Sequence, residues 1–222
     1  YMERYKDFTV DKERFPDLEK LVADMKSEGF RLVPIIDAGV KIEEGYEVYE
    51  DGVKNNYFCK NAEGEDFVGA VWPGRVHFPD FLNPETRKWF GNKYAVLTNM
   101  GIEGFWNDMN EPAIFYTEDR LSDTLKEIEK LTSGNMGIDE YFTFTGMVAG
   151  LNGNKGDYDK FYHNVNGEQV NHSEVHNIYG MNMTRSAFEA LREICPEKRT
   201  LFFSRSSYIG AHRYGGIWQG DN

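Results

Sequence analysis

The chain has 222 residues, of which 40% are hydrophobic and 15% aromatic, and its formal net charge is −12. This hydrophobic content excludes the class of intrinsically disordered chains. The acidic excess disfavours nucleic acid and anionic membrane surfaces as partners, because like charges repel. No run of about 18 apolar residues is present to span a bilayer. The composition therefore predicts a globular protein without a nucleic acid or membrane partner.

The two cysteines, Cys59 and Cys195, are far apart in the sequence and lack the spacing of a metal site. We interpret both as reduced thiols, which favours a cytoplasmic location. The chain begins with a polar segment, residues 1–6, and ends at residues 220–222 directly after an apolar run. We therefore expect it to be a fragment of a longer protein, so that any targeting segment would lie outside it.

The first predicted element is an amphipathic helix that begins at Pro16 and ends before Gly29. Its apolar residues follow the helical i, i+3, i+4, i+7 spacing: Leu18, Leu21, Val22 and Met25. The mostly apolar run 30–36 then predicts a buried strand that ends on Asp37.

The same order of helix and strand recurs further along the chain. Asn83 and Pro84 predict the start of a second helix, which Gly101 follows, and the apolar run 104–106 leads to Asp108. Because parallel strands are joined by helical crossovers, this order predicts an α/β fold with a parallel sheet.

Two more strands are predicted near the end of the chain. A third helix ends before Pro196, and the run 200–203 after it forms a strand that leads to Arg205. The short run 216–218 leads to Asp221. These strands extend the predicted parallel sheet.

Long loops are expected at about residues 38–80 and 112–178, each after the carboxyl end of a strand. Structureless loops of this length within a domain are usually functional, and barrel and open α/β folds place active sites at this end of the strands. Within the second loop, residues 150–167 are rich in Asn and Gly and could instead be a mobile surface insertion.

Three carboxylates, those of Asp37, Asp108 and Asp221, follow apolar strand-like runs. Parallel strands would bring them to one rim, where a carboxylate and a carboxylic acid can cleave a glycosidic bond. Taken singly, each Asp could instead cap a loop or the next helix. The neighbouring residues decide between these interpretations.

Those neighbours carry a family resemblance. Residues 106–111 read Trp-Asn-Asp-Met-Asn-Glu, and residues 218–222 read Trp-Gln-Gly-Asp-Asn. Both segments resemble the nucleophile and acid/base motifs of glycoside hydrolase family 31, in the order of that family. The resemblance extends over the chain through Tyr1-Met2-Glu3-Arg4, Pro34-Ile35-Ile36-Asp37, Val71-Trp72-Pro73-Gly74, His176-Asn177-Ile178-Tyr179-Gly180 and Ser204-Arg205-Ser206.

The resemblance implies a (β/α)8 TIM barrel, of which residues 1–222 would be a fragment, about strands 3 to 6, without the flanking domains of the family. It implies Asp108 as the nucleophile and Asp221 as the general acid and then base. It also implies a sugar pocket lined by Ile35, Trp72, Trp106, Met109, Arg205 and Trp218. For the aromatic residues, core packing is the alternative.

Elementary electrostatics fits these roles. Arg205 could hold the pKa of Asp108 down, and partial burial beside Trp218 would favour a protonated Asp221. We expect Asp37 to support the rim, and Glu111 to anchor the turn after Asp108 and not to act as the catalytic acid.

The hypothesis from sequence is a retaining, exo-acting α-glucosidase that removes terminal glucose from α-linked gluco-oligosaccharides through a covalent glucosyl-aspartate. We expect no cofactor, because no glycine-rich phosphate loop follows a strand. We also expect no metal, although His172 and His176 are four residues apart. The alternatives are an α-transglucosylase or α-xylosidase of the same family, or a non-catalytic carbohydrate-binding relative; α-xylosidases of the family usually have Phe-Gly where Met109-Asn110 stand. The oligomeric state is left open.

Overall fold

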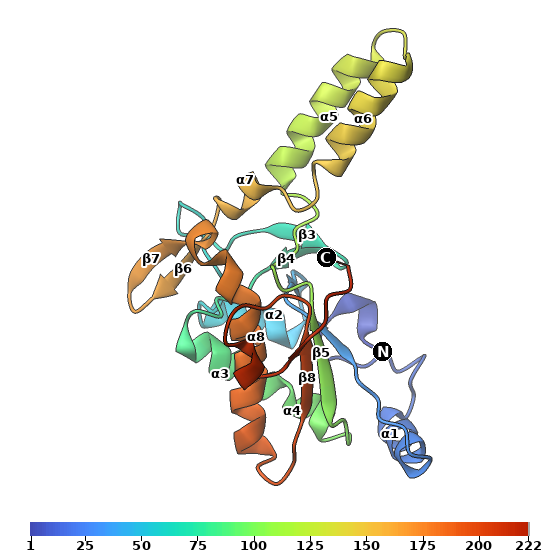
Figure 1. The fold of residues 1–222 in the computed structure, drawn as a ribbon, viewed down its shortest axis with the longest axis vertical. Coiled ribbons are helices and arrows are strands. Elements are labelled where there is room, and N and C mark those ends of the chain that lie inside the picture. Colours follow the sequence, from blue (N-terminus) through green and yellow to red (C-terminus); the bar gives the residue numbers. More distant parts are fainter. Residues whose placement is uncertain (222) are drawn as a thin grey trace.

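A four-stranded parallel sheet lies at the centre of the computed structural model, which describes residues 1–221 (Figure 1). The strand order is β1, β5, β8, β9, and all neighbouring pairs are parallel. The strands span Ile35–Asp37 (β1), Gly104–Asp108 (β5), Leu201–Ser204 (β8) and Gly216–Ile217 (β9). All four predicted strands are therefore present, although β1 begins five residues later than the predicted run.

The register of the sheet aligns the ends of its strands. Asp37 is the partner of Asp108, and Ser204 is the partner of both Asn107 and Ile217. Because aligned residues of neighbouring parallel strands point their side chains to the same face, the side chains of Asp37 and Asp108 emerge side by side. The carboxyl ends of the strands thus form one rim, as part of a (β/α)8 barrel requires.

Two of the predicted helices differ in their bounds from the expectation. Helix α1 (Leu18–Ser27) begins two residues after Pro16, because the Asp17 side chain caps it by accepting a hydrogen bond from the Lys20 amide. Helix α3 (Pro84–Lys93) begins at the predicted cap, Asn83. The predicted continuation of this helix is a separate short element, α4 (Ala95–Thr98).

Helix α8 (His172–Ile194) lies along β8 and packs against α3 (Figure 1). The side chain of Asn171 caps it by accepting from the Ser173 amide, so α8 begins within the loop predicted for residues 112–178. The two helices approach closely at Gly91, where an added Cβ would lie 2.3 Å from the Ser186 carbonyl oxygen. Only glycine permits this approach.

The core between the sheet and these helices is aromatic. The Phe105 ring on β5 packs edge-on against Tyr94 at 4.9 Å and stacks on Phe202 of β8 at 6.1 Å. The rings of Tyr94 and Phe105 are fully buried. This packing fixes the position of β5, the strand that ends on Asp108.

The segment after β1 is structured, although the sequence predicts a long loop there. It forms a three-stranded antiparallel sheet in the order β2, β4, β3. The elements are β2 (Val40–Lys41), α2 (Glu47–Lys54), β3 (Gly69–Val71) and β4 (Gly74–His77). These strands are two to four residues long, which is too short for periodicity alone to reveal them.

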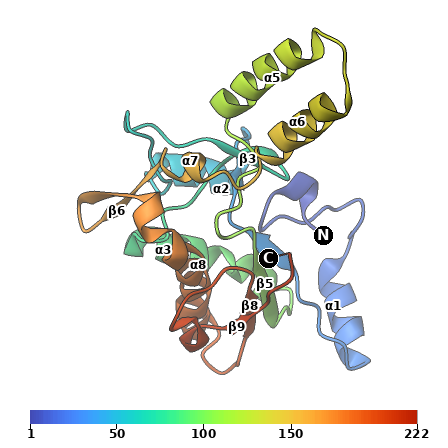
Figure 2. The ribbon, with the colours of Figure 1, turned by 45° about the horizontal axis from the view of Figure 1, so that its top comes forward.

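The segment after β5 also carries its own elements. Helices α5 (Glu118–Thr132) and α6 (Ile138–Ala149) form a hairpin that extends away from the body of the molecule (Figures 1 and 2). Helix α7 (Lys155–Tyr158) and the antiparallel pair β6 (Tyr162–Val165) and β7 (Glu168–Asn171) follow.

The stretch 150–167 is packed against the body and is not a surface insertion, because Asp157, Phe161 and His163 are fully buried. Two 3-10 turns complete the described elements, at Glu3–Tyr5 and Ala211–Arg213. Among the described residues, no helix is both long enough and apolar enough to cross a bilayer.

Candidate active site

Asp108 is the last residue of β5 and its side chain is 7% exposed. The Nε atom of Arg205 lies 3.2 Å from its Oδ1 atom. Oδ1 nevertheless has no hydrogen-bond donor among residues 1–221, so this contact is an ion pair without hydrogen-bond geometry. The oxygen is thus neutralised by a nearby cation while its lone pairs stay available.

Arg205, directly after β8, contacts three carboxylates. Its Nε and Nη2 atoms donate to the two oxygens of Glu111 at 3.0 and 2.8 Å. Its Nη1 atom lies 3.6 Å from Oδ2 of Asp221. The guanidinium therefore joins the rim ends of β5, β8 and β9, and the two-point contact with Glu111 fixes its plane.

The turn after Asp108 is held by Asn110, whose role the sequence did not reveal. Met109 has a positive φ of 55°, which turns the chain sharply at the end of β5. The fully buried Asn110 side chain then donates to the Ser204 hydroxyl at 2.8 Å and accepts from the Ser206 amide at 3.0 Å. These bonds lock the rim ends of β5 and β8 together.

Burial sets the direction of the Asp108 pKa. It raises the pKa of the carboxyl, while a hydrogen bond from the Met109 backbone and the charge of Arg205 act to lower it. The predicted effect of Arg205 thus has the expected direction, but the net pKa lies above its ordinary value because burial outweighs it. Glu111 and Asp221 add to the rise.

Asp221 differs from the expectation, because its side chain is 68% exposed where partial burial beside Trp218 was expected. It lies in a turn with a positive φ of 67°, four residues after β9. The Trp218 amide donates to the Ser204 carbonyl oxygen, which ties the start of this segment to β8. The remaining surface of the Asp221 carboxyl is not covered by the four strands of the sheet.

Asp37 lies beside Asp108 at the rim, in the supporting position expected for it. It is 5% exposed, and its amide donates to Oδ1 of the buried Asp7 at 3.1 Å. Burial, and then the charge of Asp108, raise the pKa of Asp37 to about 7, while Arg205 acts to lower it. The raised pKa of Asp37 favours its protonated form, which limits the negative charge beside Asp108.

The predicted aromatic residues lie on the same rim. Trp106 packs edge-on against Trp218 at 4.6 Å and stacks on Phe203 at 6.0 Å. Ile35 is the register partner of Trp106 on the neighbouring strand. The buried Nε1 of Trp106 has no hydrogen-bond partner among the described residues, so it can donate to a ligand.

Trp72 forms the tip of the β3–β4 hairpin, is 58% exposed, and packs edge-on against Phe115. It lines a cavity of about 580 Å³ together with Tyr1, Ile35 and Asp37. The loop after β1 thus brings Trp72 to the rim from which Asp37 and Ile35 emerge.

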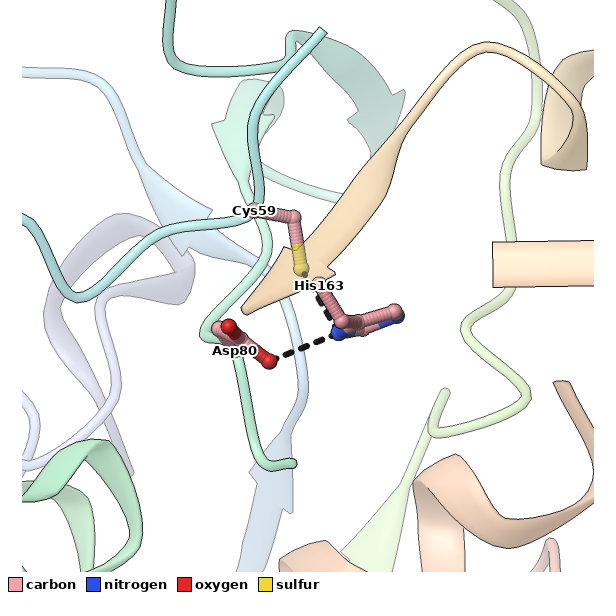
Figure 3. Close-up of side chains that lie close together, drawn as sticks. All are labelled: Cys59, Asp80 and His163. Atoms are coloured by element: carbon pink, nitrogen blue, oxygen red, sulfur yellow. Dashed lines mark hydrogen bonds and ion pairs between the residues drawn. The ribbon is translucent and has the colours of Figure 1, made fainter. Parts of the chain in front are cut away.

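One group of side chains outside this rim has the residue types of a metal site. The ligand atoms of Cys59, Asp80 and His163 lie within 4.8 Å of one another and the three residues are buried (Figure 3). His163 Nδ1 is 2.7 Å from Asp80 Oδ1 and 3.5 Å from Cys59 Sγ. His172 and His176, the pair considered from the sequence, are hydrogen-bonded to each other at 2.8 Å.

Comparison with known proteins agrees with this geometry. The model of the glycosyl hydrolases family 31 TIM-barrel domain matches residues 1–222. The chain is 37% identical over its whole length to alpha-glucosidase 2 of Bacillus thermoamyloliquefaciens, of which it covers 24%. It is 30% identical over its whole length to an alpha-glucosidase of Saccharolobus solfataricus, of which it covers 29%.

Solved structures give the same result. The whole chain superposes on 20% of the alpha subunit of glucosidase II with bound Glc1Man2, with a TM-score of 0.74 and 26% identity. The chain thus spans about a quarter of the length of the curated relatives it matches. It belongs to glycosyl hydrolase family 31, and its residues form part of the TIM-barrel domain of that family.

Proposed function

We propose that the protein containing this chain is a retaining, exo-acting α-glucosidase that hydrolyses terminal α-linked glucose from oligosaccharides. The observation that supports this most strongly is the pairing of two carboxylates on one guanidinium: Arg205 lies 3.2 Å from Asp108 and 3.6 Å from Asp221. Retaining glycosidases need two carboxyl groups close together on either side of the scissile bond. The relatives named as alpha-glucosidases support the choice of glucose.

In the first step, Oδ1 of Asp108 attacks the anomeric carbon and forms a carbon–oxygen bond to it. The glycosidic bond breaks, and Asp221 donates its proton to the departing oxygen. In the second step, water attacks the anomeric carbon while Asp221 accepts a proton from it, and the bond to Asp108 breaks. Two inversions at one carbon retain the configuration, and no cofactor enters either step.

The surroundings of the two carboxyls suit different roles. The Arg205 cation acts to lower the pKa of the buried Asp108 without engaging the lone pairs of Oδ1, which leaves that oxygen available as a nucleophile. Asp221 follows β9 on the same rim and lies 3.6 Å from the Arg205 guanidinium, where it can act as the acid and then as the base. The proton on Asp37 limits the negative charge beside Asp108.

The sugar would lie among the apolar and aromatic side chains of the rim. Trp106 and Trp218 offer a corner formed by two perpendicular rings, and Ile35 lies beside it on β1. Trp72 would close the pocket from the β3–β4 hairpin, and Met109 would close it from the turn after β5. Arg205 would bind hydroxyl groups of the sugar. Such a combination of apolar faces and few polar groups matches the two kinds of surface that a pyranose presents.

The test uses the full-length enzyme, an aryl α-glucoside and two variants. We expect Asp108→Ala to lower kcat by at least about 10⁴-fold, because the covalent route is lost. Azide should then partly restore cleavage by attacking the anomeric carbon directly, which yields the β-glucosyl azide. In Asp221→Ala, azide should attack the glucosyl-enzyme instead and yield the α-glucosyl azide.

The anomer of the azide product separates the two roles by NMR. His212→Gln is a matched control, because His212 is exposed and lies outside the site. Normal hydrolysis by Asp108→Ala would refute the proposal. A β-glucosyl azide from Asp221→Ala would mean that Asp221 is the nucleophile and Asp108 the acid/base. Product analysis at high maltose concentration distinguishes hydrolysis from glucosyl transfer.

The cytoplasmic location remains a prediction, in keeping with the free thiols of Cys59 and Cys195.

A further inference from the structure

The edge of β1 that faces away from β5 is satisfied by two side chains from residues 1–8. The β5 backbone donates to the Pro34 carbonyl oxygen, and alternate residues of a strand direct their backbone groups to opposite sides, so Ile35 and Asp37 share the other edge. There the Tyr1 hydroxyl donates to the Ile35 carbonyl oxygen at 3.0 Å. The Asp37 amide donates to Oδ1 of Asp7 at 3.1 Å. Two side chains thus take the place of a neighbouring strand at the carboxyl end of β1.

Asp7 is held in place by contacts that do not involve β1. The residue is 1% exposed, and its backbone carbonyl oxygen accepts from the Tyr46 hydroxyl at 2.8 Å. The next residue, Phe8, has a positive φ of 62°. Its buried ring packs edge-on against Phe90 at 5.2 Å and against Tyr94 at 5.1 Å. Because such a φ persists only where the surroundings impose it, the aromatic core fixes the Asp7 carboxyl beside the end of β1.

The position of the Asp37 side chain depends on its backbone. Oδ1 of Asp37 is buried and has no hydrogen-bond partner among residues 1–221, so this oxygen does not anchor the carboxyl. The backbone amide of the same residue is the group that Asp7 holds, and the register places Asp37 level with Asp108. A buried amide without an acceptor is costly, so the end of β1 would shift to find another one. Such a shift would move the Asp37 carboxyl relative to Asp108.

We propose that Asp7 is a positioning residue of the active site: by accepting from the Asp37 amide, it keeps the Asp37 carboxyl beside the nucleophile Asp108. Asp7 is almost fully buried, so it acts through Asp37 and does not contact the sugar. Tyr1 holds Ile35 in the same way, and Ile35 and Asp37 line one cavity. The inference rests on the proposed role of Asp108.

The test compares two replacements of Asp7 in the full-length enzyme, with an aryl α-glucoside as substrate. Asp7→Asn keeps an oxygen that accepts from the Asp37 amide, and we expect kcat to stay within about three-fold of wild type. Asp7→Leu has a similar size without the acceptor, and we expect kcat to fall by about ten-fold, because small misplacements at a reacting centre are costly. Hydrogen–deuterium exchange in the peptide that contains residues 35–37 should be faster in the Leu variant than in the Asn variant.

A double-mutant cycle tests whether the loss acts through the Asp37 side chain. In an Asp37→Ala background, Asp7→Leu should lower kcat by less than about two-fold, because the carboxyl that Asp7 positions is gone. A residue that only stabilises the fold would lower kcat by the same factor in both backgrounds. Val22→Ala is the matched control for stability, because Val22 is buried in α1, outside the rim. It should lower the melting temperature and leave kcat unchanged.

If Asp7→Leu does not fold, as judged by thermal unfolding, Asp7→Ala removes the same acceptor without added bulk and is expected to give the same loss. Wild-type kcat in the variant that lacks the acceptor would overturn the inference. So would an equal loss in Asp7→Asn, or a full loss that persists in the Asp37→Ala background. Failure of the proposed function would appear instead as normal hydrolysis by Asp108→Ala, a variant that none of these comparisons uses.

Discussion

The two parts of the segment that follows β5 differ sharply. Its first residues, from Met109 to Glu111, are fixed by bonds to β8 and to Arg205. Its next elements, α5 and α6, have no buried residue and expose large apolar side chains such as Ile138 and Phe142. The residues directly after β5 are therefore held firmly at the candidate active site. The α5–α6 hairpin, which follows a few residues later, makes few contacts with the body of the molecule.

This contrast follows from where buried polar groups find partners. Asn110 and Glu111 lie where unpaired groups would be costly, so each is matched by a donor or acceptor from β8 or from the two residues directly after it. The two helices of the hairpin pack against each other, ion pairs such as that of Arg120 with Asp157 join only the start of α5 to the body, and most side chains of the hairpin face solvent. We therefore expect substitutions in the first part to change catalysis and stability strongly, and those in the second to change little.

Among the substitutions that test this contrast, the largest effect on activity is expected for Arg205→Leu. It would leave Glu111 and Asp108 without their cation, and we expect kcat/KM to fall by about 10³-fold and the protein to lose about 3 kcal/mol of stability. Steady-state kinetics and thermal unfolding measure both. Arg205→Lys keeps the charge without the two-point geometry and should be intermediate. Wild-type kinetics in the Leu variant would contradict the role given to this contact.

The next effect is on stability alone and is expected in the core under the site. Phe105→Ala would remove a fully buried ring that packs on Tyr94 and Phe202, at a cost of about 3–5 kcal/mol. Denaturant or thermal unfolding of the full-length protein measures it. A cost below about 1 kcal/mol would mean that β5 is held mainly by something other than this packing.

The buried carboxyl of Asp37 should make stability depend on pH. Its pKa is raised in the folded state to about 7, so the favourable contribution of its proton is complete below the unfolded value of about 4 and is lost as the pH rises through 7. Asp37→Asn should therefore flatten the decline in melting temperature between pH 5 and 8 and be more stable than wild type at pH 8. An unchanged slope would show that Asp37 is ionised throughout.

The smallest effect is expected in the hairpin. Phe142→Ala is predicted to change stability by no more than about 0.5 kcal/mol and kcat/KM by less than two-fold, because the ring is 64% exposed. This variant is the counterpart of Phe105→Ala, with the same atoms removed from an exposed helix. A large loss of activity would show that α6 contributes to the site.

The sequence predicted the four parallel strands and their order along the chain because each is a short apolar run that ends on a polar residue. It did not predict the elements of residues 38–80 and 112–178. Their strands are two to four residues long, and β2 pairs with β4 and not with the next strand along the chain. Periodicity cannot detect elements that tertiary contacts create.

For the site, the motifs led to Asp108, Asp221 and Arg205. They did not reveal the direction of the Asp108 pKa shift or how exposed Asp221 is. The net rise in the pKa of Asp108 and the exposure of Asp221 depend on how much surface each loses, which no motif encodes. The hydrogen bonds among Asp80 and the histidines were also missed, because His163 is remote in sequence from Asp80, and only the spacing of His172 and His176 hinted at them.

The central claim is that Asp108 forms a bond to the sugar, and covalent labelling tests it most directly. A 5-fluoro-α-glucosyl fluoride has a good leaving group and slows the second step, because the fluorine destabilises the positive charge at the anomeric carbon. After inactivation of the full-length enzyme, peptide mapping by mass spectrometry should find one added fluoroglucosyl group on Asp108. An adduct on Asp221 or Glu111, or turnover without any adduct, would contradict the account.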